Sequence, residues 1–162
     1  MSRTGHSYIK SKIIETNALL GGEMSGHIFF NDDWYGFDDA IYSALRMIEI
    51  LSKTKLTSHE VFNSYPKHFS TPEINLKVPE EEKFKIIDEL KNLIKSSGYV
   101  LIDIDGIRLE NENSWGLIRA SNTSPNLVLR FEGKKESDLL EIKNYFKELL
   151  SKIEIDLKLD FS

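Results

Sequence analysis

Cysteine is absent from this 162-residue chain. Without thiols the chain forms neither disulfides nor thiolate metal sites, so a bound metal would need carboxylates and the four histidines as ligands. The chain also lacks an apolar run of the ~20 residues that a membrane span needs, and residues 1–12 contain no apolar segment typical of a secretion signal. These absences disfavour membrane insertion and secretion, and they predict a cytoplasmic protein.

An excess of basic residues is also lacking, because the chain has 21 lysines and arginines and 26 aspartates and glutamates, which gives a net charge of −5. This balance disfavours nucleic-acid binding, which needs a basic face. Hydrophobic residues make up 40% of the chain, enough for a sizeable core. We therefore expect a soluble globular protein in which a few well-placed groups hold any anionic ligand.

The first 56 residues predict two helices and a possible hairpin. A short helix runs from residue 6 to near 17, a glycine-rich loop leads into a strand at 27–30, and a second helix starts at Asp38 and Asp39. The second helix is predicted from apolar residues at i, i+3, i+4 and i+7: Ile41, Ala44, Leu45 and Ile48. These elements hardly suffice for an independent core, so residues 1–56 look like part of a domain.

Residues 57–69 are polar and contain proline, which predicts a linker with one short helical turn. Residues 70–162 then predict an α+β domain with a four-stranded, mainly antiparallel sheet and two helices on one face. A strand at 70–78 comes first, followed by a helix that begins at Pro79 and a final helix at 137–150. Between the helices lie four short β-like runs, at 99–104, 107–111, 115–120 and 127–131.

A polar loop at residues 119–125 joins two of these runs and contains no acid. An arginine guanidinium can hold a phosphate through two parallel hydrogen bonds, and hydroxyl, amide and backbone donors can complete the cradle. The candidate phosphate ligands are Arg119, Ser121, Asn122 and Thr123. The same residue types are common in ordinary polar turns, so the local sequence leaves both interpretations open.

A second loop, at residues 21–27, places Glu23, Ser25 and His27 among glycines. A carboxylate can accept hydrogen bonds from two neighbouring sugar hydroxyls, so this set suits a polyol. A glycine-rich hairpin turn with a solvated Glu23 is the alternative. His6, at the start of the first helix, is a candidate for proton transfer, but simple helix capping by Thr4 or Ser7 is the favoured interpretation of that segment. His6, Glu23 and His27 could in principle bind a metal, but their spacing specifies none.

Five motifs occur in an order that resembles the α-D-phosphohexomutases, specifically their phosphomannomutase/phosphoglucomutase branch. The resemblance covers essentially the whole chain, as the end of the family's third domain plus its fourth domain. The motifs are Arg3-Thr4-Gly5-His6-Ser7, Gly22-Glu23-Met24-Ser25-Gly26-His27, Gly36-Phe37-Asp38-Asp39-Ala40, Ser70-Thr71-Pro72-Glu73 and Arg119-Ala120-Ser121-Asn122-Thr123.

The resemblance implies an incomplete α/β/α domain followed by a domain like the TATA-box-binding protein. It also implies an isomerase that exchanges the 1- and 6-phosphates of glucose or mannose through a bisphosphate intermediate. Glu23 and Ser25 would hold the sugar 3- and 4-hydroxyls, with His27 and His6 beside the sugar and His6 assisting proton transfer. The residues that would clamp the phosphate are Arg119, Ser121, Asn122 and Thr123.

Two family motifs do not occur in the sequence: the phosphoserine loop of Ser-His-Asn-Pro type and the magnesium loop of Asp-Gly-Asp-Gly-Asp type. We therefore expect this chain to be inactive alone and to bind no metal, with Mg²⁺ and the family's N-terminal domains supplied by a parent enzyme from which the chain is truncated. A stand-alone phosphosugar-binding module and a structural interaction domain are the alternative interpretations.

Overall fold

The computed structural model describes residues 1–94 and 98–153. The chain divides into two compact units, Met1–Pro66 (unit 1) and Lys67–Ser162 (unit 2). Within the described ranges, no helix combines the length and the apolar character needed to cross a membrane.

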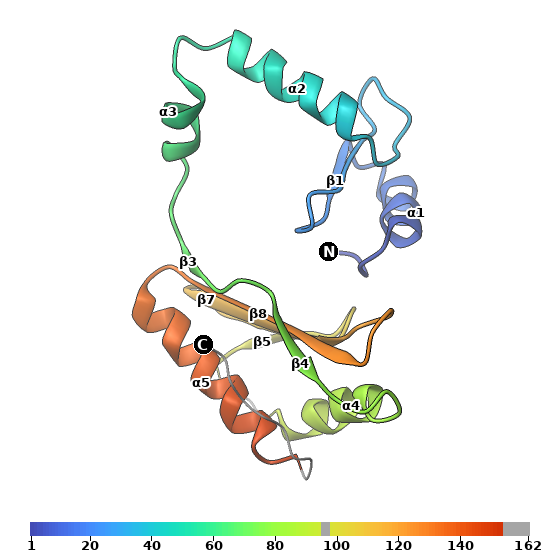
Figure 1. Cartoon of the computed structure of the whole chain (residues 1–162), viewed down its shortest axis with the longest axis vertical. Helices are drawn as coiled ribbons and strands as arrows, with labels where there is room; N and C mark the ends of the chain where they lie inside the picture. Colours follow the sequence, from blue (N-terminus) through green and yellow to red (C-terminus); the bar gives the residue numbers. More distant parts are fainter. Residues whose placement is uncertain (95–97, 154–162) are drawn as a thin grey trace. The chain divides into compact units, whose positions relative to one another are not determined.

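Unit 1 contains a two-stranded antiparallel hairpin and three helices (Figure 1). Gly21 and Gly22, which the sequence places in a loop, instead belong to the first strand of the hairpin, where Gly21 pairs with Phe29. The helix α3 confirms the short helical turn predicted within residues 57–69. In chain order the elements are α1 (His6–Thr16), β1 (Leu20–Gly22), β2 (Ile28–Phe30), α2 (Ala40–Ser52) and α3 (Ser58–Asn63).

The helix α1 packs closely on the hairpin because Gly21 has no side chain. A Cβ atom at Gly21 would lie 2.9 Å from Ile13 Cδ1 and 3.0 Å from Ile9 Cγ2. Ile9, Ile13 and Phe29 are the buried apolar residues of unit 1, with Ala18 packed against them. This small core fixes the first residue of α1, His6, next to the turn of the hairpin.

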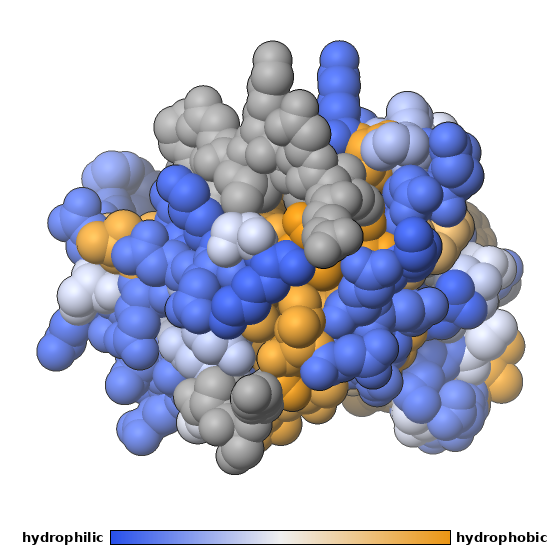
Figure 2. Space-filling view, turned by 90° about the horizontal axis from the view of Figure 1, so that it is seen from below, coloured by the Kyte–Doolittle hydropathy of each residue, from blue (hydrophilic) through white to orange (hydrophobic). Residues whose placement is uncertain are grey.

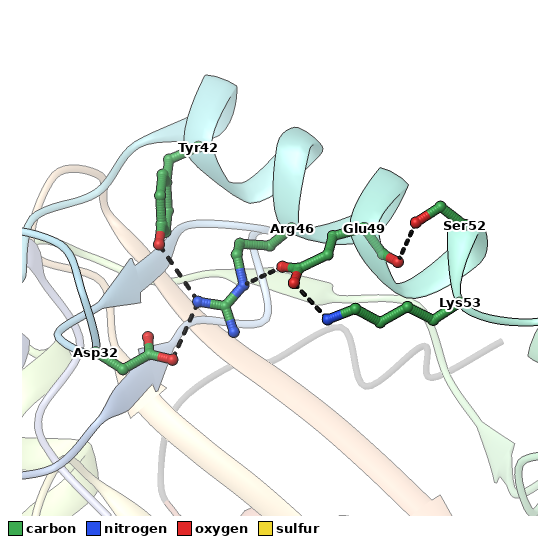
Figure 3. Close-up of polar contacts among 6 residues, drawn as sticks. All are labelled: Asp32, Tyr42, Arg46, Glu49, Ser52 and Lys53. Atoms are coloured by element: carbon green, nitrogen blue, oxygen red, sulfur yellow. Dashed lines mark hydrogen bonds and ion pairs between the residues drawn. The ribbon is translucent and has the colours of Figure 1, made fainter.

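The helix α2 forms as the sequence predicts, and Asp39 caps it by accepting a hydrogen bond from the Tyr42 backbone N–H. Its apolar face is not buried, however, since Ile41 is 76% exposed and Ile48 61% exposed. Aromatic and polar contacts attach α2 instead. Tyr42 stacks on Trp34, with ring centroids 4.2 Å apart. Arg46 donates a hydrogen bond to Asp32 Oδ2 at 3.0 Å, as Figure 3 shows, and its guanidinium also stacks over Phe30.

Unit 2 is an α+β fold with a mainly antiparallel sheet, as expected. Among the described residues the sheet has six strands instead of four, in the order β3-β8-β7-β6-β5, with β4 also paired to β8. One of the additional strands arises at the edge, where Pro72 lacks an N–H and the stretch 70–78 splits into the two segments β3 and β4. The strands are β3 (Phe69–Ser70), β4 (Ile74–Lys77), β5 (Val100–Ile102), β6 (Ile107–Glu110), β7 (Ser114–Ala120) and β8 (Asn126–Gly133).

Two helices, α4 (Lys83–Leu93) and α5 (Glu136–Leu150), cover one face of this sheet (Figure 1). The helix α4 begins four residues later than Pro79, because Glu82 N–H bonds to the Pro79 carbonyl and makes a turn there. Alternate residues of β7 are buried, starting at Ser114, so Arg119 lies on the face away from the helices. The apolar side chains of sheet and helices form one continuous core, and Figure 2 shows an apolar strip between hydrophilic surfaces on the helical side.

Candidate functional site

Three of the predicted site residues meet in unit 1. Each of His6, Glu23 and His27 offers a nitrogen or oxygen atom, and these atoms all lie within 4.8 Å of one another. His6 comes from the start of α1, whereas Glu23 and His27 flank the turn between β1 and β2, which the bond from Glu23 N–H to the His27 carbonyl closes at 2.9 Å. The loop and the N-terminal motif, far apart in sequence, therefore form one site.

Hydrogen bonds orient the side chains of this cluster. The Gly5 backbone N–H donates to Glu23 Oε1 at 2.7 Å. His27 Nδ1 lies 2.6 Å from Asp38 Oδ2, and His6 Nε2 lies 3.6 Å from the same oxygen. One carboxylate thus stands beside both imidazoles.

Asp38 is a residue that the sequence interpretation missed. Its sequence position suggests a helix start, but only Asp39 caps α2, and Asp38 turns toward the histidines and the Ile28 backbone N–H. A helix cap requires only one aspartate, but two adjacent aspartates precede α2. The additional aspartate was the feature of the sequence that could have indicated another role for Asp38. The remaining predicted residue, Ser25, lies exposed in the turn of the hairpin.

The predicted phosphate loop lies in unit 2, directly after β7. Arg119 is half-buried, Asn122 and Thr123 are exposed, and Ser121 is only 7% exposed. Ser121 Oγ accepts hydrogen bonds from the Thr123 backbone N–H at 3.3 Å and from the Ser124 hydroxyl at 2.8 Å. By accepting these two bonds, Ser121 fixes the shape of the loop. Its hydroxyl proton is still available for donation, because a hydroxyl both accepts and donates.

Lys83 lies against this loop and was not identified from sequence. Its side chain is 3% exposed, and Nζ donates to the Ser124 carbonyl at 3.4 Å while pairing with Glu80. Lys83 precedes Ile86, Ile87 and Leu90 at helical spacing, so a cation on the apolar stripe of α4 was the signal for it. It places a positive charge next to the candidate anion site.

The turn between β5 and β6 packs against the backbone of Arg119. Gly106 has a φ of +81°, and a Cβ there would lie 2.3 Å from the Ile118 carbonyl oxygen and 2.7 Å from the Arg119 Cα. Only glycine fits this position without displacing the strand. The turn therefore helps to fix the direction in which β7 presents Arg119.

A hollow of about 210 Å³ lies at the opposite end of β7, beside Ser114 and Trp115. Its other lining residues include the ion pair of His68 with Glu132, whose Nδ1 and Oε1 atoms are 2.8 Å apart. None of the predicted site residues lines this hollow. It is therefore separate from the Arg119 loop.

Two parts of the chain match models of one known protein family. Residues 1–69 match the model "Phosphoglucomutase/phosphomannomutase, alpha/beta/alpha domain III", and residues 73–149 match the model of the C-terminal domain of the same family. The chain belongs to the phosphoglucomutase/phosphomannomutase family. Its fold and motif order agree with that membership.

Proteins similar to this chain occur in several bacteria. The chain is 51% identical over 161 residues to a phosphomannomutase/phosphoglucomutase of Pseudomonas putida, covering 99% of this chain and 35% of that protein. It is 47% identical over 152 residues to a phosphoglucomutase of Neisseria meningitidis, covering 93% of this chain and 33% of that one.

Among solved structures, a phosphoglucomutase/phosphomannomutase family protein from Burkholderia thailandensis matches with a TM-score of 0.84 and 43% identity, covering 95% of this chain and 33% of that chain. The present chain thus spans about a third of the length of the relatives that it matches.

The magnesium ion that the family resemblance implies does not fit the cluster of unit 1. Within the part of the chain that the structure describes, His6, Glu23 and His27 are the group of His, Asp and Glu side chains close enough to share an ion. Mg²⁺ prefers oxygen ligands and octahedral geometry, whereas two of these three ligands are imidazoles. These residues are therefore not its site.

Proposed function

We propose that this chain supplies the sugar and phosphate recognition of a phosphomannomutase/phosphoglucomutase that interconverts hexose 1-phosphate and hexose 6-phosphate. The observation that carries the proposal is the convergence of His6, Glu23 and His27 in one site of a chain that belongs to this family. The cluster presents a carboxylate and imidazoles, which are acceptors for sugar hydroxyls.

The sugar would bind at the hairpin turn of unit 1. Glu23 Oε1 already accepts the Gly5 N–H, so the second carboxylate oxygen is available to a hydroxyl. With its Nδ1 proton directed at Asp38, His27 would present Nε2 as an acceptor. Ser25 would supply a further hydroxyl, and His6 would accept or return a proton at the sugar. A site that reads only the 3- and 4-hydroxyls would accept both glucose and mannose.

The phosphate that is not being transferred would bind at the loop after β7. Arg119 would form paired hydrogen bonds to it, and Ser121, Asn122 and Thr123 would add neutral donors. The buried charge of Lys83 would favour an anion at this place. A fixed anchor remote from the reacting centre converts binding energy into positioning, which a substrate that reverses its orientation requires.

The phosphoryl transfer itself would need groups outside these residues. The sequence contains neither a Ser-His-Asn-Pro loop nor an Asp-Gly-Asp-Gly-Asp loop. We therefore expect the 162-residue chain alone to convert no glucose 1-phosphate into glucose 6-phosphate in a coupled assay. Clear turnover by the purified chain would contradict this assignment of roles.

A chimaera tests the proposal directly. This chain would replace the matching 161-residue segment of the Pseudomonas putida enzyme, and mutase activity would be measured with mannose 1-phosphate and glucose 1-phosphate. We expect an active chimaera in which Arg119→Ala lowers kcat/KM by about 10- to 100-fold, the loss of one charge-assisted contact of ~1.5–3 kcal/mol.

The matched control is Arg108→Ala. Arg108 lies on the neighbouring strand β6, where its guanidinium stacks over Trp115 and pairs with Glu110, outside the phosphate loop. This variant should retain kcat/KM within about threefold, as expected of a surface pair. Equal activities for the two arginine variants would reject the phosphate clamp.

A further inference from the structure

We propose that His6, Glu23 and His27 form a binding site for a divalent transition-metal ion of the zinc class. Their ligand atoms lie within 4.8 Å of one another. Ligands about 2.0–2.2 Å from a tetrahedral Zn²⁺ lie roughly 3.4 Å apart, so small side-chain rotations would close the set around an ion. The metal would bind the same side chains to which sugar recognition is assigned above, but the test of metal binding does not depend on that assignment.

The donor set matches zinc chemistry. Two imidazoles and one carboxylate are three protein ligands of the kind that zinc uses when its fourth position is left to water. Imidazole also suits copper, nickel and cobalt, whereas magnesium and calcium select oxygen. The site should therefore discriminate strongly between Zn²⁺ and Mg²⁺.

The surroundings of the three ligands supply the outer contacts that such sites need. A metal-bound imidazole commonly donates its other N–H to a carboxylate, and His27 Nδ1 lies 2.6 Å from Asp38 Oδ2. A metal-bound carboxylate is commonly held by a further hydrogen bond, and Glu23 Oε1 accepts the Gly5 N–H at 2.7 Å. Both ligands are thus oriented before an ion arrives.

The cluster is also held in shape by its backing. The ring of His6 contacts the fully buried Phe29 edge-on, with ring centroids 5.5 Å apart, and contacts His27 at 4.6 Å. Two carboxylates, Glu23 and Asp38, stand next to the two imidazoles, and an ion of charge +2 would balance them. Ordered ligands lose little conformational entropy on binding, which favours affinity.

Binding of Zn²⁺ and Co²⁺ to the whole 162-residue chain tests this site. Calorimetry with Zn²⁺ should give one ion per chain, and Co²⁺ should give the intense visible absorption of a four-coordinate complex. The double variant His6→Asn/His27→Asn should weaken Zn²⁺ binding by more than about 100-fold, because outer-shell losses alone cost 10–100-fold. Mg²⁺ should produce no comparable heat.

The chain offers a matched control in its other two histidines. His59 bonds to Asn63 and His68 to Glu132, so neither belongs to the cluster. His59→Asn/His68→Asn should leave affinity and stoichiometry unchanged. If this control pair abolishes binding, or if the cluster pair leaves it intact, the proposed site is wrong.

Two conservative variants keep the test decisive should the double variant misfold. Glu23→Gln keeps the shape of a ligand but removes its charge, and Asp38→Asn keeps the three ligands but removes the carboxylate that lies beside His27 and His6. Amide NMR spectra verify folding. Each should weaken Zn²⁺ binding by about 10- to 100-fold, and unchanged affinity in both would overturn the proposal. All measurements are made without sugar, so a failure of sugar recognition leaves their interpretation intact.

Discussion

The two units attach their amphipathic helices in different ways. In unit 2 the helix α5 buries Ile142, Phe146, Leu149 and Leu150 against the sheet, whereas no residue of α2 in unit 1 is buried. Both helices show a clear apolar periodicity in the sequence. The difference lies in what faces them, since α5 has a broad sheet to cover and α2 has a hairpin of two three-residue strands. Periodicity thus predicts a helix and an apolar face, but not its burial.

The energetics of the two attachments differ accordingly. Arg46 links α2 to Asp32, and its hydrogen bonds to Tyr42 and Asp32 raise the pKa of its guanidinium above the ordinary value. Solvent screens such exposed pairs, so they contribute little to stability. Full burial of one phenylalanine contributes about 1.5–3 kcal/mol. Burial of Phe146 therefore attaches α5 more strongly than the Arg46 pair attaches α2.

The largest predicted effect concerns the core of unit 2. Phe131 is fully buried and packs edge-on against Phe146, with ring centroids 5.3 Å apart. Phe131→Ala should lower the free energy of unfolding of unit 2 by about 3–5 kcal/mol, because it leaves a cavity. Urea unfolding followed by unit 2 amide resonances measures the loss. The exposed Leu140 on α5 gives the control, since Leu140→Ala should change stability by less than about 0.5 kcal/mol.

A smaller effect is expected at the start of α2. Asp39→Ala removes the acceptor of the Tyr42 N–H, and it should destabilise the helix by about 1 kcal/mol because little packing compensates. Hydrogen exchange of the amides in residues 43–52 should become faster. Asp39→Asn, which keeps an acceptor, should retain most of the protection. Slow exchange in Asp39→Ala would mean that α2 is held more firmly than its exposure indicates.

The smallest effect is a pH dependence of α3. Hydrogen bonds from the Thr57 backbone and hydroxyl lower the pKa of the Glu60 carboxyl in the folded helix. This stabilisation is present above the carboxyl's unfolded pKa and is lost as pH falls through the lowered value. The Cα chemical shifts of residues 58–63 should therefore move toward coil values below about pH 4. Glu60→Gln does not titrate, so an equal acid response in that variant would exclude the carboxyl as its cause.

Much of the local structure could be predicted from sequence. The helices α2 and α5 and the strand β7 follow from periodicity, and the family follows from five ordered motifs. The start of α4 at Pro79 was predicted too early, because a proline suited to a first turn also suits the preceding turn that forms there. The exposure of Ile41 and Ile48 was not predictable, because it depends on what lies opposite the helix.

The sequence by itself determined the residue types of both candidate sites and the elements that bear them, since these depend on neighbours along the chain. Only the tertiary structure brought His6 close to Glu23 and His27. Their proximity requires α1 to pack on the strand β1, where Gly21 has no side chain to prevent the contact. Folding likewise placed Asp38 beside the imidazoles and Lys83 against the loop that follows β7. Contacts between distant residues arise from packing, which local patterns do not encode.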